Sequence, residues 1–194
     1  MKLKAKNKYF ISGMTLIELI VSMGIIVFIT AIFVANYRSA NKRTDLIMAS
    51  QSLVSDFHRA QNNALGLLKY GDEVPAGGWG VSFNLNNKTQ YVVFADLQPP
   101  GASGYMEYGP GEGDIPQGAR IVQLPPVTEI SALRLNGTLR SSASVTFLPP
   151  DPRTNIYSNG ATSTALEIDL QEVGTGLTKT IKVNFLGLAE VLNN

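Results

Sequence analysis

The chain has 194 residues, a formal net charge of +1 and no cysteine. This length allows one membrane-anchored domain or one ordinary globular domain. The lack of cysteine excludes disulfides, thiolate metal sites and a cysteine nucleophile.

Residues 1–13 form a short basic leader that carries four lysines and no acid: Lys2, Lys4, Lys6 and Lys8. Without this leader, 12 basic and 15 acidic side chains remain, and beyond Thr44 the balance is 9 to 14. A mildly acidic outer domain is poorly suited to gathering phosphate backbones, so nucleic acid is a minority expectation among partners. The leader lysines predict retention on the cytoplasmic side of a membrane.

Residues 14–35 are almost continuously apolar. As a helix these 22 residues would extend about 33 Å, which is enough to cross the hydrocarbon core of a bilayer. The interruptions are few: Thr15, Glu18, Ser22, Gly24 and Thr30.

Residues 36–70 continue the helix with an amphipathic pattern. No proline occurs before Pro75, and apolar residues recur at three- and four-residue steps, which predicts a stripe facing a core. We therefore expect one helix from about residue 14 to about residue 69, roughly 80 Å long, that ends near Gly66 or Gly71. The stripe contains Leu46, Ala49, Leu53, Phe57, Ala60, Ala64 and Leu67, and the expected polar face contains Lys42, Asp45, Ser52, Asp56, Arg59 and Asn63.

Residues 71–194 have the composition of a β-rich head. Short segments rich in Val, Ile, Tyr and Phe predict strands, with hairpin turns at Asn86–Lys88 and Gly174–Gly176. Pro-Pro pairs after three of the segments predict strand ends, because proline cannot donate to a ladder. The expected fold is α+β, a long helix packed on an antiparallel sheet. The predicted strands are 79–85, 89–95, 120–124, 132–135, 144–148, 165–170 and 178–185.

Glu18 is the one acid within the apolar run. An ionised carboxylate inside a membrane span costs several kcal/mol, and such residues are normally paired and functional. A cut after Gly13 would create an ammonium group at Met14, about 6 Å away along the axis of a helix. That ammonium group, in the same chain or a neighbour, would be a natural partner for Glu18.

The stretch Ser12-Gly13-Met14-Thr15-Leu16-Ile17-Glu18 resembles the processing site of type IV prepilins and of the pseudopilins of type II secretion and competence systems. The resemblance implies a pilin-like fold, cleavage between Gly13 and Met14 by prepilin peptidase, N-methylation of Met14, and an assembly role for Glu18. It also implies other pilin subunits and an inner-membrane assembly platform as partners. The protein would cross the bacterial inner membrane once, leader inside and head outside, and then enter a cell-surface or periplasmic filament.

The resemblance extends to the minor pseudopilins of the GspH/FimT-like group through Leu53–Ala64, Trp79-Gly80-Val81 and Phe185-Leu186-Gly187. Two departures from the family pattern are Met14, where phenylalanine is common, and Ala35, near which many major pilins have a helix-bending proline. A minor subunit is therefore expected rather than a major one.

Several alternatives stay open for residues 1–35 and for the head. A secretory signal peptide would have a shorter apolar core without an acid and a small-x-small cleavage site, which residues 31–35 lack. A plain signal anchor would explain the lysines and the apolar run but not Gly13 or Glu18. The head could belong to a tip-located pilin that binds DNA or a surface, or to a membrane-anchored protein unrelated to filaments.

No enzyme activity, cofactor or metal is expected. The single histidine, His58, is expected at the helix surface without a partner, and no nucleophile elbow is present. Residues 151–155 offer oxygen ligands, but they lack the spacing of a calcium loop and are expected to form a plain turn.

Overall fold

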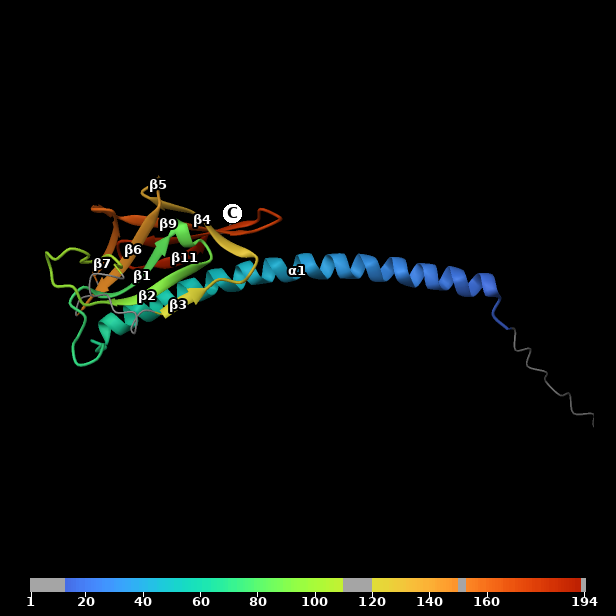
Figure 1. The fold of residues 1–194 in the computed structure, drawn as a ribbon, viewed down its shortest axis with the longest axis horizontal. Coiled ribbons are helices and arrows are strands. Elements are labelled where there is room, and N and C mark those ends of the chain that lie inside the picture. Colours follow the sequence, from blue (N-terminus) through green and yellow to red (C-terminus); the bar gives the residue numbers. More distant parts are fainter. Residues whose placement is uncertain (1–12, 110–119, 150–152, 193–194) are drawn as a thin grey trace, which may run out of the picture. The chain divides into compact units, whose positions relative to one another are not determined.

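A computed structural model describes residues 13–109, 120–149 and 153–192, with the backbone alone for Ala35 and residues 38–40 (Figure 1). It confirms the expected α+β class, with an N-terminal apolar helix and a C-terminal antiparallel β domain. The chain divides into two units, Met1–Asn41 and Lys42–Asn194. The described core lies wholly in the second unit, called the head below, so the head has the means to fold by itself. The predicted leader, up to residue 12, lies outside the described residues.

Helix α1 (Leu16–Leu65) begins at a threonine cap. The hydroxyl of Thr15 accepts a hydrogen bond from the backbone N–H of Glu18 at 3.3 Å, and its carbonyl accepts one from Leu19 at 3.2 Å. A threonine cap satisfies an N–H group that would otherwise lack a partner in the first turn. Met14 therefore precedes the helix, and the axial distance of 6 Å, which assumed a helical Met14, does not apply.

The C-terminal end of α1 is a Schellman motif. Leu67 is in the left-handed region with a φ of 50°, its N–H donates to the carbonyl of Ala64, and the N–H of Leu68 donates to the carbonyl of Asn63. The αL position of this motif usually holds glycine. Here Gly66 lies one residue too early, and the helix ends at Leu65 rather than near residue 69.

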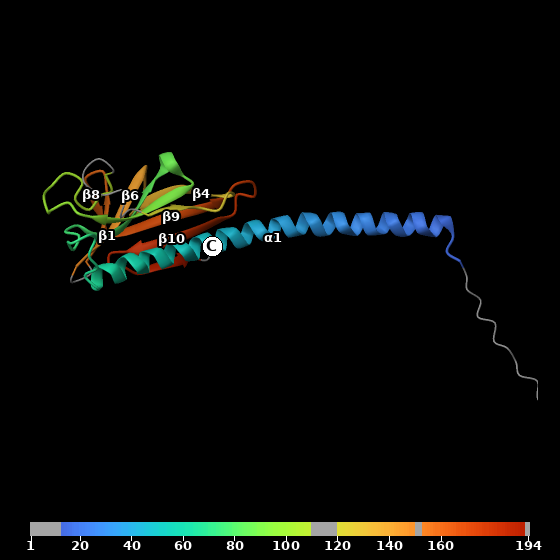
Figure 2. The same cartoon turned by 60° about the horizontal axis from the view of Figure 1, so that its bottom comes forward.

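The head contains two antiparallel sheets (Figures 1 and 2). The six-stranded sheet has the order β3 (Arg120–Gln123), β2 (Gln90–Asp96), β1 (Gly78–Asn84), β6 (Ser142–Leu148), β7 (Arg153–Ser158) and β8 (Ala161–Ser163). The five-stranded sheet has the order β11 (Ala189–Leu192), β10 (Thr178–Asn184), β9 (Ala165–Glu172), β4 (Thr128–Leu135) and β5 (Thr138–Arg140). A short 3-10 helix, η1 (Leu85–Asn87), joins β1 to β2, where a hairpin loop was predicted.

All seven predicted strands are confirmed within a few residues, whereas β5, β7, β8 and β11 were not predicted. The turn expected at residues 151–155 is wrong for Arg153–Asn155, which begin β7 and pair with the end of β6. Residues 151 and 152 lie outside the described part. Strand β2 ends before Pro99 and β3 ends before Pro125, as expected for proline after a strand.

The second half of α1 packs into the head through the predicted stripe. Leu46, Ala49, Leu53, Phe57, Ala60 and Ala64 are all buried, and Leu67 is exposed because it lies beyond the helix. The ring of Phe57 lies 6.0 Å from that of Phe83 on β1, which in turn lies 5.9 Å from Tyr91 on β2. Small alanines alternating with large side chains let the helix approach the sheet closely.

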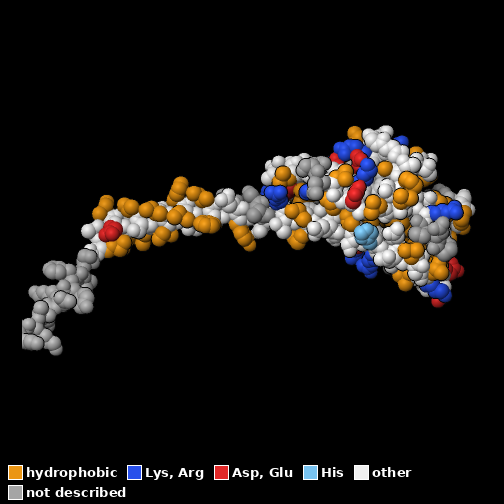
Figure 3. Space-filling view, turned by 180° about the vertical axis from the view of Figure 1, so that it is seen from behind, with side chains coloured by type: hydrophobic (Ala, Val, Ile, Leu, Met, Phe, Trp, Pro, Cys, Tyr) orange, Lys and Arg blue, Asp and Glu red, His pale blue; other side chains and the backbone are white. Residues whose placement is uncertain are grey.

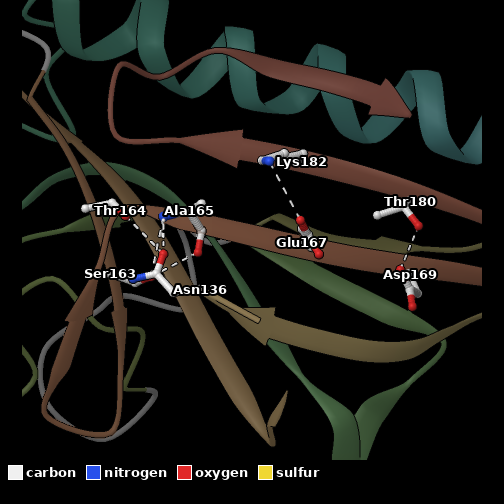
Figure 4. Close-up of polar contacts among 8 residues, drawn as sticks. All are labelled: Asn136, Ser163, Thr164, Ala165, Glu167, Asp169, Thr180 and Lys182. Carbon is white, nitrogen blue, oxygen red and sulfur yellow. Dashed lines mark hydrogen bonds and ion pairs between the residues drawn. The ribbon is translucent and has the colours of Figure 1, made fainter. Parts of the chain in front are cut away.

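The outer face of the five-stranded sheet carries a ladder of polar contacts (Figure 4). Thr180 donates to Asp169 at 2.8 Å, and Lys182 lies 3.8 Å from Glu167. Arg134 also donates to Asp169, at 2.6 Å. These cations are matched by acids on neighbouring strands, so the face carries no unmatched basic stripe within the described residues.

Replacing Leu67 with glycine is expected to stabilise the head. A side chain in the left-handed region costs roughly 1–2 kcal/mol, and glycine avoids that cost. Leu67→Ala removes the same half-exposed side chain but keeps the Cβ, so it is the matched control. Urea unfolding of the head should give Leu67→Gly a free energy of unfolding about 1 kcal/mol above that of Leu67→Ala. Equal stability of the two variants would contradict the assigned cap.

Candidate functional site

The predicted cleavage point lies in exposed chain directly before α1. Gly13 and Met14 are both exposed, and Met14 has 61% of its surface accessible. A Cβ added at Gly13 would meet no described atom within 4 Å, and its φ lies outside the left-handed region. The fold of the described chain therefore places no demand for glycine at this position.

Glu18 lies in the first turn of α1 with its side chain exposed. Its carboxylate has no hydrogen-bond or ion-pair partner among the described residues, although its backbone carbonyl accepts a bond from the Ser22 hydroxyl at 2.7 Å. The positive end of the helix dipole stabilises an acid at this position. Figure 3 shows acidic atoms among mainly apolar side chains on the face of the helix in view.

The segment Leu16–Val34 is long and apolar enough to cross a membrane, with a mean hydropathy of 2.6 and none of its residues buried. Its exposed side chains are mostly apolar, and Figure 3 shows them on the face in view. A helix that is hydrophobic all round requires an apolar environment, either lipid or the interior of an assembly.

Asp56 was expected on the polar face of the helix, and that expectation is wrong. Its side chain is 5% exposed and accepts a hydrogen bond from the hydroxyl of Tyr91 at 2.7 Å and another from the guanidinium of Arg120. Burial, followed by the hydrogen bond to Asp56, raises the pKa of Tyr91 well above its ordinary value. The sequence does indicate that Asp56 is buried. It lies three residues after Leu53 and four residues before Ala60, so it shares the helix face of the buried stripe.

A second buried acid, Glu172, lies at the end of β9 and was not singled out from the sequence. Lys42 of α1 lies 3.0 Å from its Oε1, and Thr175 donates to its Oε2 through both the backbone N–H, at 2.8 Å, and the hydroxyl. The hydrogen bonds from Thr175, followed by Lys42, lower the pKa of Glu172 below its ordinary value. This cluster ties the β9–β10 hairpin to the first turn of the helix within the head.

His58 is exposed, as expected, and the described residues hold no group of three histidines or acids placed to bind a metal. A hollow of about 330 Å³ on the six-stranded sheet is lined mainly by hydroxyl and amide side chains and by Glu107. Glu107 accepts a hydrogen bond from the backbone N–H of Asn159, and the other titratable side chains in that lining are Tyr91 and Tyr108.

Comparison of the chain with models of known protein families, with curated proteins and with solved structures found no match.

The Glu172 cluster predicts that the head loses stability in acid. Because the folded pKa of Glu172 is lowered, its stabilising contribution is complete above the ordinary glutamate pKa of about 4.3 and is lost as the pH falls through the folded value. Glu172→Gln should weaken this dependence. Thermal unfolding of the head between pH 7 and pH 3 measures it, with the exposed Glu190→Gln as control. The interpretation fails if Glu172→Gln and wild type lose the same stability over this range.

Proposed function

We propose that this chain is a structural subunit, a minor pilin or pseudopilin, of a type IV pilus or a type II secretion-like filament. Prepilin peptidase would cut between Gly13 and Met14, and the new N terminus would be methylated. The apolar part of α1 would hold the subunit in the inner membrane and later in the filament core. The head would form part of the outer surface of the filament.

The observation that carries this proposal is Glu18 on an exposed apolar helix directly after Gly13. A simple anchor has no use for an acid there, since charged residues within an apolar membrane span are costly and are normally paired and functional. It also has no use for a glycine in open chain, where any residue would fit. A peptidase site followed by an assembly acid accounts for both.

The assembly step follows from the charge on Glu18. Cleavage leaves an ammonium group on Met14, in the non-helical segment just ahead of the Thr15 cap. A carboxylate without a partner in lipid gains one when the ammonium group of a neighbouring subunit is brought to its depth. Pairing in a low-dielectric environment is far stronger than in water, so it favours the packed filament over the dispersed subunit.

The head supports a binding or structural role rather than a catalytic one. Its buried acids are matched by cations and hydroxyl groups, as at Asp56, Asp169 and Glu172. Such satisfied clusters hold elements together and do not leave a group free to react.

The mature N terminus is the decisive test of this proposal. We expect mass spectrometry of the protein from its native host to find an N-terminal peptide that starts with N-methylated Met14. An unprocessed Met1 would indicate a plain anchor, and a cut near Ala35 would indicate a secretory signal peptide. Either result would overturn the proposal.

Replacing Glu18 with glutamine is expected to block incorporation into filaments without blocking membrane insertion. Glutamine keeps the shape of the side chain but cannot pair with an ammonium group, whereas Ser22→Ala, one turn further on, removes only a hydrogen bond to the backbone. The amount of each variant in sheared filaments and in the membrane fraction gives the comparison. Normal recovery of Glu18→Gln in filaments would refute the assembly role.

A further inference from the structure

We propose that one end of the head is a lipid-docking surface, formed by the tip of the β9–β10 hairpin and the adjacent β3–β4 turn. This inference rests on the proposed function, because that function places the apolar segment in a membrane. All residues of the surface itself belong to the head. The surface, called the entry face, consists of Pro126, Val173 and Leu177, with Lys42 of α1 beside the hairpin.

The hairpin tip presents two aliphatic side chains with no packing role. Val173 is 53% exposed and Leu177 is 47% exposed, and the three residues between them are exposed as well. Gly174 and Gly176 have positive φ angles, so the tip is a tight turn without bulky side chains. Two apolar side chains on a narrow, glycine-rich tip are well shaped to insert between lipid headgroups.

The β3–β4 turn widens this surface. The N–H of Val173 donates to the carbonyl of Val127 at 2.8 Å, so Pro126, which is exposed, lies next to the hairpin. The N–H of Thr128 donates to the carbonyl of Pro125, which closes the turn. Backbone hydrogen bonds therefore fix both segments of the entry face, the β9–β10 hairpin and the β3–β4 turn.

The β9–β10 hairpin contacts Lys42, which is the first residue of the part of α1 that belongs to the head. Lys42 pairs with Glu172, and a Cβ built on Gly174 would lie 3.2 Å from the Lys42 ammonium nitrogen. Arg43, the next residue, is exposed and has no ion-pair partner among the described residues. An exposed cation directly after Lys42 in the chain suits a bilayer surface that contains anionic lipid.

The covalent connection identifies the occupant as lipid. Residue 42 follows Val34, the last residue of the apolar segment, by eight residues of the same helix, a rise of about 12 Å. A headgroup layer is roughly 5–8 Å thick, so the linking chain is short enough to keep the entry face within reach of the membrane that would hold the segment. A tether this short gives a high effective concentration, so even a weak surface would be occupied.

A second exposed apolar side chain provides a contrast. Leu139 on β5 is 67% exposed, more than either hairpin residue. Strand β4 begins opposite Glu172 and ends opposite Leu166, so the β4–β5 turn lies at the other end of the sheet from the β9–β10 hairpin. Leu139 therefore serves as a control, because it is exposed and apolar but lies at the end of the sheet away from the entry face.

The test uses the full chain in nanodiscs of phosphatidylglycerol and phosphatidylethanolamine. The natural sequence has no cysteine, so P126C and T138C each supply a single site for a polarity-sensitive fluorophore. Both positions are exposed. We expect a lipid-borne quencher to quench the P126C label strongly and the T138C label little. Adding V173S and L177S to P126C should abolish most of that quenching, whereas adding L139S should leave it unchanged.

Three results would overturn the proposal. They are equal quenching of the two labels, quenching of the P126C label that survives V173S and L177S, and a blue shift of this label that follows protein concentration instead of lipid. The last would assign the face to another copy of the chain. Thermal unfolding of the variants shows whether the head remains folded. The N-terminal peptide is independent of these readouts, so failure of the docking surface leaves the proposed function standing.

Discussion

One helix has to satisfy two environments, and the organisation of the chain follows from that constraint. From Leu16 to Val34 the side chains of α1 are apolar on every side, while from Leu46 onward only one stripe is apolar and buried. No proline interrupts the change, so a single hydrogen-bonded helix carries both patterns. The head then assembles its core on the second pattern, with Phe57 in contact with the aromatic side chains of the six-stranded sheet.

The acids of the chain divide into two groups by how their charge is satisfied. Asp56, Asp169 and Glu172 are buried in the head, and each meets a cation from another segment together with a hydroxyl group. Glu18 is instead exposed on an apolar helix and has no such partner within the described residues. Buried charges are costly unless they are paired. A partner for Glu18 therefore has to come from outside the described chain, which is the physical basis of the assembly role that we propose.

The Glu172 cluster links the stability of the head to the surface that we propose for lipid docking. The ion pair with Lys42 and the hydrogen bonds from Thr175 hold the β9–β10 hairpin against the helix, and the same hairpin presents Val173 and Leu177 outward. A docking surface on rigid elements loses little entropy on binding. Entry of the subunit into a filament would then require these two side chains to leave the lipid together with the apolar segment Leu16–Val34.

The sequence by itself determined the α+β class, the apolar segment, the buried helical stripe and seven strands, because these depend on the local periodicity of apolar residues. It also supplied Gly13, Met14 and Glu18, whose meaning lies in their order along the chain. Tertiary structure alone decided the four short edge or hairpin strands, the burial of Asp56 and the Glu172 cluster. The four strands are only three to six residues long and pair with the neighbouring strand of a hairpin, so their side-chain alternation is too short to stand out in the sequence. Asp56 is tolerated in the core only because Tyr91 and Arg120 reach it from other strands. Pairings of this kind have no local pattern, so they become visible only when the chain is folded.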